Sequence, residues 1–414
     1  MKAIAHLLAA SLLVLSLSAA AQTKLTPAQY AQDVEYFWQT VNDNYAYFDQ
    51  KQTDWARVHA VYRPQADTLS SRRSLVRLLE TMLGELYDHH AGLGTNQPDS
   101  RRLVPSATDV YAQWQGGRAV VVDVRRGFGA ERVGVRPGAE IVQVEGVLVE
   151  QAIRPYLAQN LKSPDEAARN YALNLLLAGA HNAERRWLVR TAGTEAEVLP
   201  DRPQPLLENI RFARSLESRR IGSTGYLKIN NSLGDNALIP AFDSALTALQ
   251  DTKALILDLR ETPSGGNTTV ARAILSRFIT REQYYQQHEL VGEERAFGVK
   301  RKWVELVTPR GQPYTRPVVL LAGRWTGSMG EGLAIAFDGM KRATVLGTEL
   351  ARLNGAIYSF RLPNSRIGFS IPTEKLYHVD GTPRENYVPK VPVPPAASSS
   401  THDVALAAAL RRLR

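Results

Sequence analysis

The stretch AGRWTGSMGEGLAIA (322–336) places one hydroxyl, that of Ser328, at the start of an apolar run. A serine hydroxyl is a poor nucleophile until a base takes its proton. In the first turn of a helix the backbone N–H groups are unpaired and the helix dipole favours negative charge. The N–H of Met329 is therefore a natural donor to an oxyanion formed when Ser328 attacks a carbonyl. Ordinary helix capping by Ser328 is the alternative interpretation.

A second donor is expected in LDLRETPSGGN (257–267), where an apolar strand ends in Gly265 and Gly266. Glycine adopts unusual backbone dihedrals and lets the main chain approach a ligand closely. The N–H of Gly266 could complete a pair of oxyanion donors with Met329. Alone, this segment is equally well a strand-end turn. It is too short for a phosphate-binding loop, and no GK[ST] follows it.

Two further stretches hold a candidate base and a candidate carboxylate. ELYDHHAGL (85–93) contains two of the eight histidines, His89 and His90, directly after Asp88. Adjacent side chains on a helix point about 100° apart, so His89 and His90 would rarely bind the same metal ion. No H-E-x-x-H motif occurs either, so a zinc peptidase is not expected. We expect no cofactor. Glu385, in GTPRENYVPKVPV (381–393), could orient a histidine or bind a substrate amine, or be a solvated turn residue.

The composition is that of a globular protein. The chain has 414 residues, 44% hydrophobic and 22% charged, which suggests two or three domains with their own cores. It has no cysteine, so disulfides, thiol nucleophiles and thiolate metal sites are excluded. The formal net charge of +9 is spread in short basic clusters, without the long basic stripe of a nucleic-acid-binding protein.

The first residues, MKAIAHLLAASLLVLSLSAAA (1–21), are typical of a secretory signal. One lysine precedes a short apolar run, and small residues lead to a cleavage site after Ala21. No later segment reaches the roughly 18 continuous apolar residues of a membrane span. We therefore expect an exported protein, periplasmic or secreted, that is soluble after cleavage.

The remaining chain divides into segments of different periodicity. Residues 26–100 show a helical period and predict a helical cap domain, and residues 205–393 alternate strands and helices, as in a mostly parallel sheet. The carboxyl ends of such strands are where ligands bind, and both ETPSGGN and GRWTGS fall there. Residues 394–414 form a tail, with a flexible Pro/Ser-rich part before a short helix.

Between the cap and the core, residues 103–200 are β-rich, with a helical insertion at 155–185. A strand, a short helix, a turn at Arg136-Pro137-Gly138 and a second strand together resemble a PDZ domain. No obvious glycine-rich carboxylate-binding loop precedes the first strand. A small β domain that only spaces its neighbours is the alternative. The predicted fold class is a multidomain α/β protein.

The order of these motifs is similar to that of the C-terminal-processing and tricorn-type serine peptidases, over roughly residues 26–393. That resemblance implies that Ser328 is the nucleophile, that His90 in a D-x-H motif is the base, that Glu385 in the late E-N motif is the glutamate, and that Gly266 is a donor. One branch of the family uses a lysine base, but Arg352 and Leu353 occupy that stretch here, and arginine stays protonated. The histidine-dependent branch is therefore expected.

One position departs from the tricorn-type pattern. His89 stands where that tetrad has a serine linking the histidine to the glutamate, so Asp88 or His89 would have to orient the base. The expected function is an exported serine endopeptidase acting on peptides or unfolded proteins. A non-catalytic peptide- or lipid-binding protein of the same fold and a serine esterase remain open alternatives.

Overall fold

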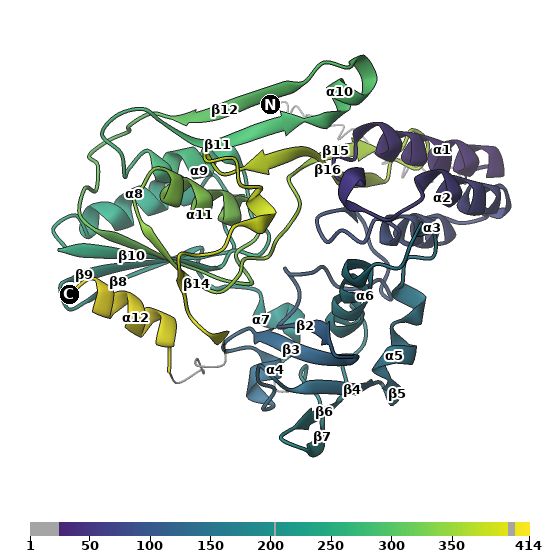
Figure 1. The fold of residues 1–414 in the computed structure, drawn as a ribbon, viewed down its shortest axis with the longest axis horizontal. Helices are drawn as coiled ribbons and strands as arrows, with labels where there is room; N and C mark the ends of the chain where they lie inside the picture. The colour runs from purple at the N-terminus through teal and green to yellow at the C-terminus, as the bar shows by residue number, and fades with distance from the viewer. Residues whose placement is uncertain (1–24, 203, 396–401) are drawn as a thin grey trace, which may run out of the picture.

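The computed structural model describes residues 25–202, 204–395 and 402–414. The predicted signal (1–21) and much of the predicted flexible stretch (396–401) lie outside these ranges. Within them the strands form three sheets, and helices pack around and between these sheets (Figure 1). No helix in the described ranges is long and apolar enough to cross a membrane.

The N-terminal part is helical, as its periodicity predicts. It consists of α1 (Pro27–Asn44), η1 (Phe48–Gln50), α2 (Trp55–Tyr62), η2 (Pro64–Thr68) and α3 (Arg72–Gly84). Thr26, Asp54 and Ser71 cap the three α-helices with their side chains, which satisfies N–H groups that a helix leaves unpaired at its start. After α3 the chain turns through His89 and His90 and continues as a short strand, β1 (Gly92–Leu93).

The second part holds an antiparallel sheet in the order β2-β3-β4-β6-β7, with β5 paired to β4. Its elements are β2 (Val110–Gln115), β3 (Arg118–Val124), α4 (Gly129–Arg132), β4 (Glu140–Val144), β5 (Val147–Leu148), α5 (Val149–Ala152), η3 (Arg154–Tyr156), α6 (Glu166–Ala178), β6 (Trp187–Thr191) and β7 (Thr194–Val198). The predicted helical insertion contains α6, which packs against β2 and shares its hydrophobic core.

The third part is built on a six-stranded sheet in the order β17-β14-β13-β10-β9-β8. The pairs from β17 to β9 are parallel, and β8 is antiparallel to β9. The strands are β8 (Leu216–Ile221), β9 (Thr224–Asn230), β10 (Ala254–Glu261), β13 (Val318–Ala322), β14 (Thr344–Gly347) and β17 (Val391–Pro392). Helices α7 (Leu206–Asn209), α8 (Leu238–Ala248), α9 (Thr268–Leu275) and α11 (Met329–Gly339) belong to the same part.

Side chains on the two faces of this sheet belong to two different hydrophobic clusters. Alternate residues of β10 pack with α8, α9 and α11 on one face and with α12 (Val404–Arg412) on the other (Figure 1). Ala405 and Ala409 of α12 are buried there. The short C-terminal helix expected from the sequence is thus part of the core.

The third sheet has no counterpart among the elements expected from the sequence. It consists of β1, β11 (Gln283–Leu290), β12 (Arg301–Val307), β15 (Ala356–Arg361) and β16 (Gly368–Tyr377), with α10 (Val291–Phe297) between β11 and β12 and η4 (Arg384–Asn386) after β16. All its pairs are antiparallel. Residues 205–393 therefore hold two sheets rather than one, and β1 joins the second of them to the cap.

Candidate active site

Ser328 lies in the turn between β13 and α11, as the N-cap residue of α11. Its backbone has φ +50° and ψ −112°, a conformation that non-glycine residues rarely adopt. The Ser328 N–H donates a 2.8 Å hydrogen bond to Oε2 of Glu331, one turn into the helix. Strained residues of this kind persist where their surroundings hold them, and they cluster at functional sites.

The glycine turn after β10 packs directly against Ser328. Gly265 has φ +64°, and a Cβ atom there would lie 2.4 Å from Cβ and 2.9 Å from Oγ of Ser328, so no side chain fits. The Gly265 N–H is engaged with the carbonyl of Thr262 at 3.1 Å. In the ranges that the structure describes, the N–H groups of Gly266 and Met329 have no acceptor. Met329 directly follows Ser328, and Gly266 directly follows the glycine that packs against it, so two N–H groups without an acceptor lie next to these two residues in the chain.

His90 is held through its Nδ1 atom, which lies 2.6 Å from the backbone oxygen of Asn354. A carbonyl oxygen only accepts, so Nδ1 must carry the proton, and the lone pair of the neutral ring is on Nε2. Burial, with the nearby Arg384 guanidinium, lowers the pKa of His90 to about 4. The imidazole is thus neutral at ordinary pH and able to accept a proton.

Asp88 accepts hydrogen bonds from both residues of this contact, His90 and Asn354. Its Oδ1 accepts the backbone N–H of His90 at 2.9 Å, and its Oδ2 accepts the Asn354 side-chain amide at 2.8 Å. The hydroxyl of Tyr45 also donates to Oδ2, at 2.7 Å. Asp88 therefore orients His90 by positioning Asn354 and the main chain, without touching the ring nitrogens.

The loop 352–355 connects this arrangement to Ser328. The buried Glu331 carboxylate accepts the N–H of Arg352 at 2.8 Å and that of Leu353 at 3.3 Å, besides the N–H of Ser328. Burial raises the pKa of Glu331 to about 7. The loop is thus bonded to the start of α11 on one side and, through Asn354, to His90 on the other.

The buried Arg384 also holds loop 352–355 in place. Its guanidinium donates to the carbonyls of Leu353 at 2.9 Å and Gly355 at 2.6 Å. Gly355 has φ +46°, and a Cβ there would come within 1.8 Å of the carbonyl oxygen of Glu374, so only glycine fits at that bend.

The two remaining predicted site residues lie nearby without contacting the ring of His90. His89 stacks on Tyr171, with ring centroids 4.4 Å apart, and burial lowers its pKa to about 4. Glu385 is buried, burial raises its pKa, and its Oε2 has no partner in the described part of the chain. The partner of His90 Nδ1 is the carbonyl of Asn354, whereas the sequence suggested the carboxylate of Glu385.

Several residues of the site were not singled out from the sequence. Glu331 follows Ser328 by three positions, the spacing of a capping box, and that signal could have found it. Asn354 acts through its backbone oxygen, which any residue type offers, so its identity carries little information about that contact. Arg384 precedes Glu385 in the same motif and had no assigned role.

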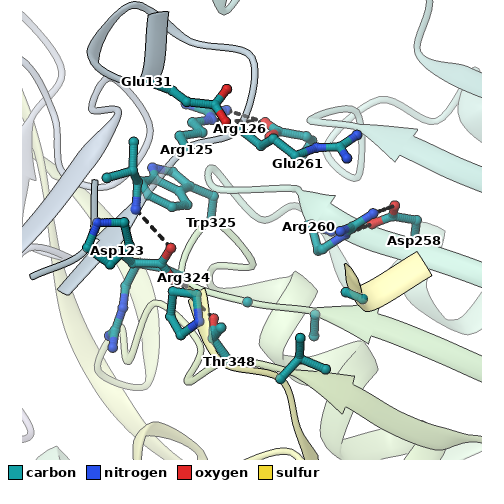
Figure 2. A pocket seen from close by; sticks show the side chains of 18 of the residues that line it. Asp123, Arg125, Arg126, Glu131, Asp258, Arg260, Glu261, Arg324, Trp325 and Thr348 are labelled. Atoms are coloured by element: carbon teal, nitrogen blue, oxygen red, sulfur yellow. Dashed lines mark hydrogen bonds and ion pairs between the residues drawn. The ribbon is translucent and has the colours of Figure 1, made fainter. Parts of the chain in front are cut away.

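The second part of the chain packs against the loop before Ser328, around a cavity of about 160 Å³ that charged side chains help to line (Figure 2). The Trp325 ring nitrogen donates to the carbonyl of Thr108 at 2.9 Å. Arg125 donates to Glu261 at the end of β10 at 2.9 Å, a pair that Figure 2 shows joined by dashed lines. Loop 323–327 is thus held by groups from both parts of the molecule.

Two family models match parts of the chain. The model of peptidase family S41 matches residues 223–393, and that of the tricorn protease C1 domain matches residues 26–84. No curated protein matches the sequence significantly.

Solved structures share the fold at low sequence identity. Mature CPAF is 17% identical with a TM-score of 0.59, covering 94% of this chain and 96% of that one. The photosystem II D1 C-terminal processing protease is 17% identical with a TM-score of 0.55, covering 89% and 94%. A putative peptidase from Parabacteroides merdae is 16% identical with a TM-score of 0.53, covering 94% and 97%. The solved structures share the fold, and the two family models identify the chain as a member of the C-terminal-processing and tricorn-type peptidases of family S41 and as a serine-type peptidase.

Proposed function

We propose that the protein is an endopeptidase whose nucleophile is Ser328 and whose general base is His90. Nε2 of His90 takes the hydroxyl proton while Oγ of Ser328 attacks the peptide carbonyl carbon. The N–H groups of Gly266 and Met329 hold the resulting oxyanion. The imidazolium then gives its proton to the leaving amine, and an acyl-enzyme remains on Ser328.

Water completes the cycle in the same geometry. Nε2 of His90 removes a proton from the water molecule as it attacks the ester carbonyl, and the same oxyanion donors act again. The imidazolium returns the proton to Oγ of Ser328, which releases the acid product. The reaction consumes only the peptide and water, and the protein groups return to their starting state.

The observation that carries this proposal is that hydrogen bonds link one loop to both residues, to Ser328 through the Glu331 side chain and to His90 directly. Glu331 joins Ser328 to Arg352 and Leu353, and the next residue, Asn354, holds the ring of His90 in the tautomer a base requires. Segments more than two hundred positions apart in the sequence are therefore connected through a few hydrogen bonds.

In this proposal Asp88 and Glu385 have different roles. Asp88 positions His90 and Asn354 through one hydrogen bond to each, and Tyr45 holds Asp88 through a third. Glu385 contributes through its charge near the site and through its backbone oxygen, which accepts from Nε of Arg352 at 2.9 Å. His89 supports the position of its neighbour by stacking on Tyr171.

The test is turnover of an unfolded protein such as β-casein by the variants Ser328→Ala and His90→Ala. Both are expected to lose activity by at least about a thousandfold while their thermal unfolding stays close to that of the wild type. Ser244→Ala on α8 and His59→Ala on α2 are matched controls, because neither residue contacts loop 352–355 or the glycine turn, and they should keep full activity. Unchanged cleavage by either site variant would remove that residue from the scheme.

A fluorophosphonate probe separates a peptidase from a binding protein on the same fold. An activated Ser328 is labelled and the Ser328→Ala variant is not, whereas a merely capping serine reacts in neither protein. A serine that is labelled, hydrolyses p-nitrophenyl acetate and leaves β-casein intact would favour the esterase alternative.

The division of the chain is part of the proposal. We assign residues 26–100 to a cap, 103–200 to a PDZ-like domain, 205–393 to the peptidase core and 394–414 to a C-terminal tail. The leader at 1–21 supports export to the periplasm or the medium. N-terminal sequencing of the mature protein would test the cut after Ala21.

A further inference from the structure

A large groove lies between the cap and the second part of the chain. Its volume is about 670 Å³, within the range of ligand-binding clefts. It is lined by α3, by the segment that follows His90, by η3 and by α6. The groove starts beside the candidate base, because Ala91 lines it and so does Tyr171, the ring stacked on His89.

The strand β1 presents one free edge to this groove. β1 pairs with β16 on its other side, with Gly92 opposite Ser370 and Leu93 opposite Phe369. The Gly94 N–H donates to the carbonyl of Gly368 at 2.7 Å, so the alternation of an antiparallel ladder turns the N–H and C=O of Leu93 away from β16. Leu93 and Thr95 both line the groove. Free edges of this kind pair with extended peptides.

The other strand edge near the groove is closed by side chains. β2 is the edge strand of its sheet, and a PDZ-type ligand would pair with it. Instead, Asn174 of α6 bonds both the N–H and the C=O of Ala112, at 3.0 and 2.8 Å, and Asn170 accepts the N–H of Trp114 at 2.8 Å. The edge of β1 is thus the one left for a peptide.

The groove also contains a positively charged residue, Arg101, that forms no ion pair with a described carboxylate. Its three carboxylates have their own partners: Glu80 accepts from Ser100, Glu85 from Tyr62 and Asn160, and Asp99 from Arg73 and Arg77. The half-buried Arg101 stacks on the ring of Tyr156 at 4.4 Å, and no described carboxylate lies within ion-pair distance of it. Glu145, whose charge acts on Arg101, is paired with Arg186.

We propose that this groove binds an extended segment of the substrate, which adds a strand to β1 at Leu93 and places a carboxylate against Arg101. The location rests on the proposed function, because Leu93 follows His90 by three residues, or roughly 10 Å along a strand. The carboxylate is either the C-terminal carboxylate of the substrate or an Asp or Glu side chain within it.

Binding is measured on the Ser328→Ala variant, which leaves the peptide intact. Four fluorescein-labelled twelve-residue Ala/Ser peptides serve as probes: one with a free C-terminus, one amidated, and two amidated with a central Glu or Gln. Fluorescence anisotropy is expected to give a Kd for the recognised carboxylate about tenfold below that of its neutral twin. Arg101→Gln should remove this difference, and Arg154→Gln, an exposed arginine on the same short helix as Tyr156, should keep it.

The four peptides distinguish the two possible sources of the carboxylate. A preference for the free C-terminus assigns the α-carboxylate, and a preference for Glu over Gln assigns a side chain. Equal binding of all four peptides, or a preference that survives Arg101→Gln, would overturn the assignment of Arg101.

The main-chain part is tested by N-methylation of single residues in the tightest peptide. Pairing with a strand edge predicts that methyl groups at alternate positions weaken binding about tenfold and that those between them do not. Uniform tolerance would exclude strand addition.

These outcomes are independent of catalysis. If the peptides bind as predicted and the wild type cleaves nothing, the proposed function fails and the groove stands. If the wild type cleaves β-casein and Arg101→Gln alters neither the Kd nor kcat/KM, the proposed function stands and the inference fails.

Discussion

The buried Glu331 and the half-buried His90 are both hydrogen-bonded to loop 352–355, and desolvation shifts their pKa values in opposite directions. The pKa of Glu331 is raised to about 7 and that of His90 is lowered to about 4. The ionised Glu331 accepts three backbone N–H groups. Protonation below about pH 7 places an O–H among these donors and weakens the bonds, whereas His90 stays neutral until far lower pH.

We therefore predict two falls of kcat/KM on the acid side, one near pH 7 from Glu331 and one near pH 4 from His90. In Glu331→Gln the upper step should disappear and the lower step should remain. The amide nitrogen cannot accept, which leaves buried N–H groups unpaired at about 1–3 kcal/mol each, so kcat should also fall at least about tenfold.

The measurement is a profile of kcat/KM from pH 3.5 to 8.5 for the wild type and Glu331→Gln. A step near pH 6.5 that persists in the variant would mean that His90 titrates as an ordinary histidine, against the buried environment described above.

At the residue scale, the sequence was informative where side chains define the chemistry. Ser328, His90, Gly265 and Gly266 have types and motif positions that predict a hydrolytic site. The hydrogen bond to His90 Nδ1 comes from the main chain of Asn354, which has no signature in residue type. The partner of the base therefore required the structure.

The two sides of helix α6 make different contacts. Asn170 and Asn174 form hydrogen bonds with the backbone of the edge strand β2, while Tyr171 and Leu175 line the groove. Asn174 is 2% exposed and makes three hydrogen bonds, two to Ala112 and one to the carbonyl of Asn170. Helix and sheet are thus joined by amide contacts as well as by apolar packing.

For Asn174→Ala we predict a loss of about 2–4 kcal/mol in the free energy of unfolding, because the N–H and C=O of Ala112 become buried without partners. Urea denaturation followed by circular dichroism measures it. Asn96→Ala, at an exposed asparagine, should change the same quantity by less than about 0.5 kcal/mol. Equal effects of the two variants would show that water replaces Asn174 without cost.

At the element scale, prediction succeeded where periodicity was clear. The apolar strands β10 and β13 and the amphipathic helices of the cap follow the expected ranges closely. The sheet of β11, β12, β15 and β16 was missed because its strands lack a regular pattern: β11 reads QYYQQHEL and buries polar residues such as Gln286 and His288. Their burial depends on partners distant in sequence, such as Glu374 for His288.

Across the whole molecule, the second part and the core meet at the ion pair of Arg125 and Glu261. Arg125 is 1% exposed and also donates to the carbonyls of Ser106 and Thr108. Thr262 directly follows Glu261 in the chain. Its carbonyl accepts the N–H groups of Gly265, which packs against Ser328, and of Gly327, which precedes Ser328. The interface between the parts therefore influences the geometry at Ser328.

We predict that Glu261→Gln lowers the free energy of unfolding by about 3–5 kcal/mol, because it leaves the buried Arg125 without a counter-charge. It should also lower kcat more than it raises KM, since Thr262 shifts with its neighbour. Glu150→Gln, which removes the partner of the exposed Arg169, should cost less than about 1 kcal/mol.

Thermal unfolding and steady-state kinetics of both variants provide the comparison. If Glu261→Gln and Glu150→Gln unfold at the same temperature and turn over alike, the contact between the two parts has no influence on the catalytic loop.

The loop at 352–355 has a consequence for how activity can be regulated. Because these four residues secure the serine and the imidazole together, any event that displaces them disarms both at once. In the proposed mechanism, the order of this loop therefore decides whether Ser328 and His90 can act together.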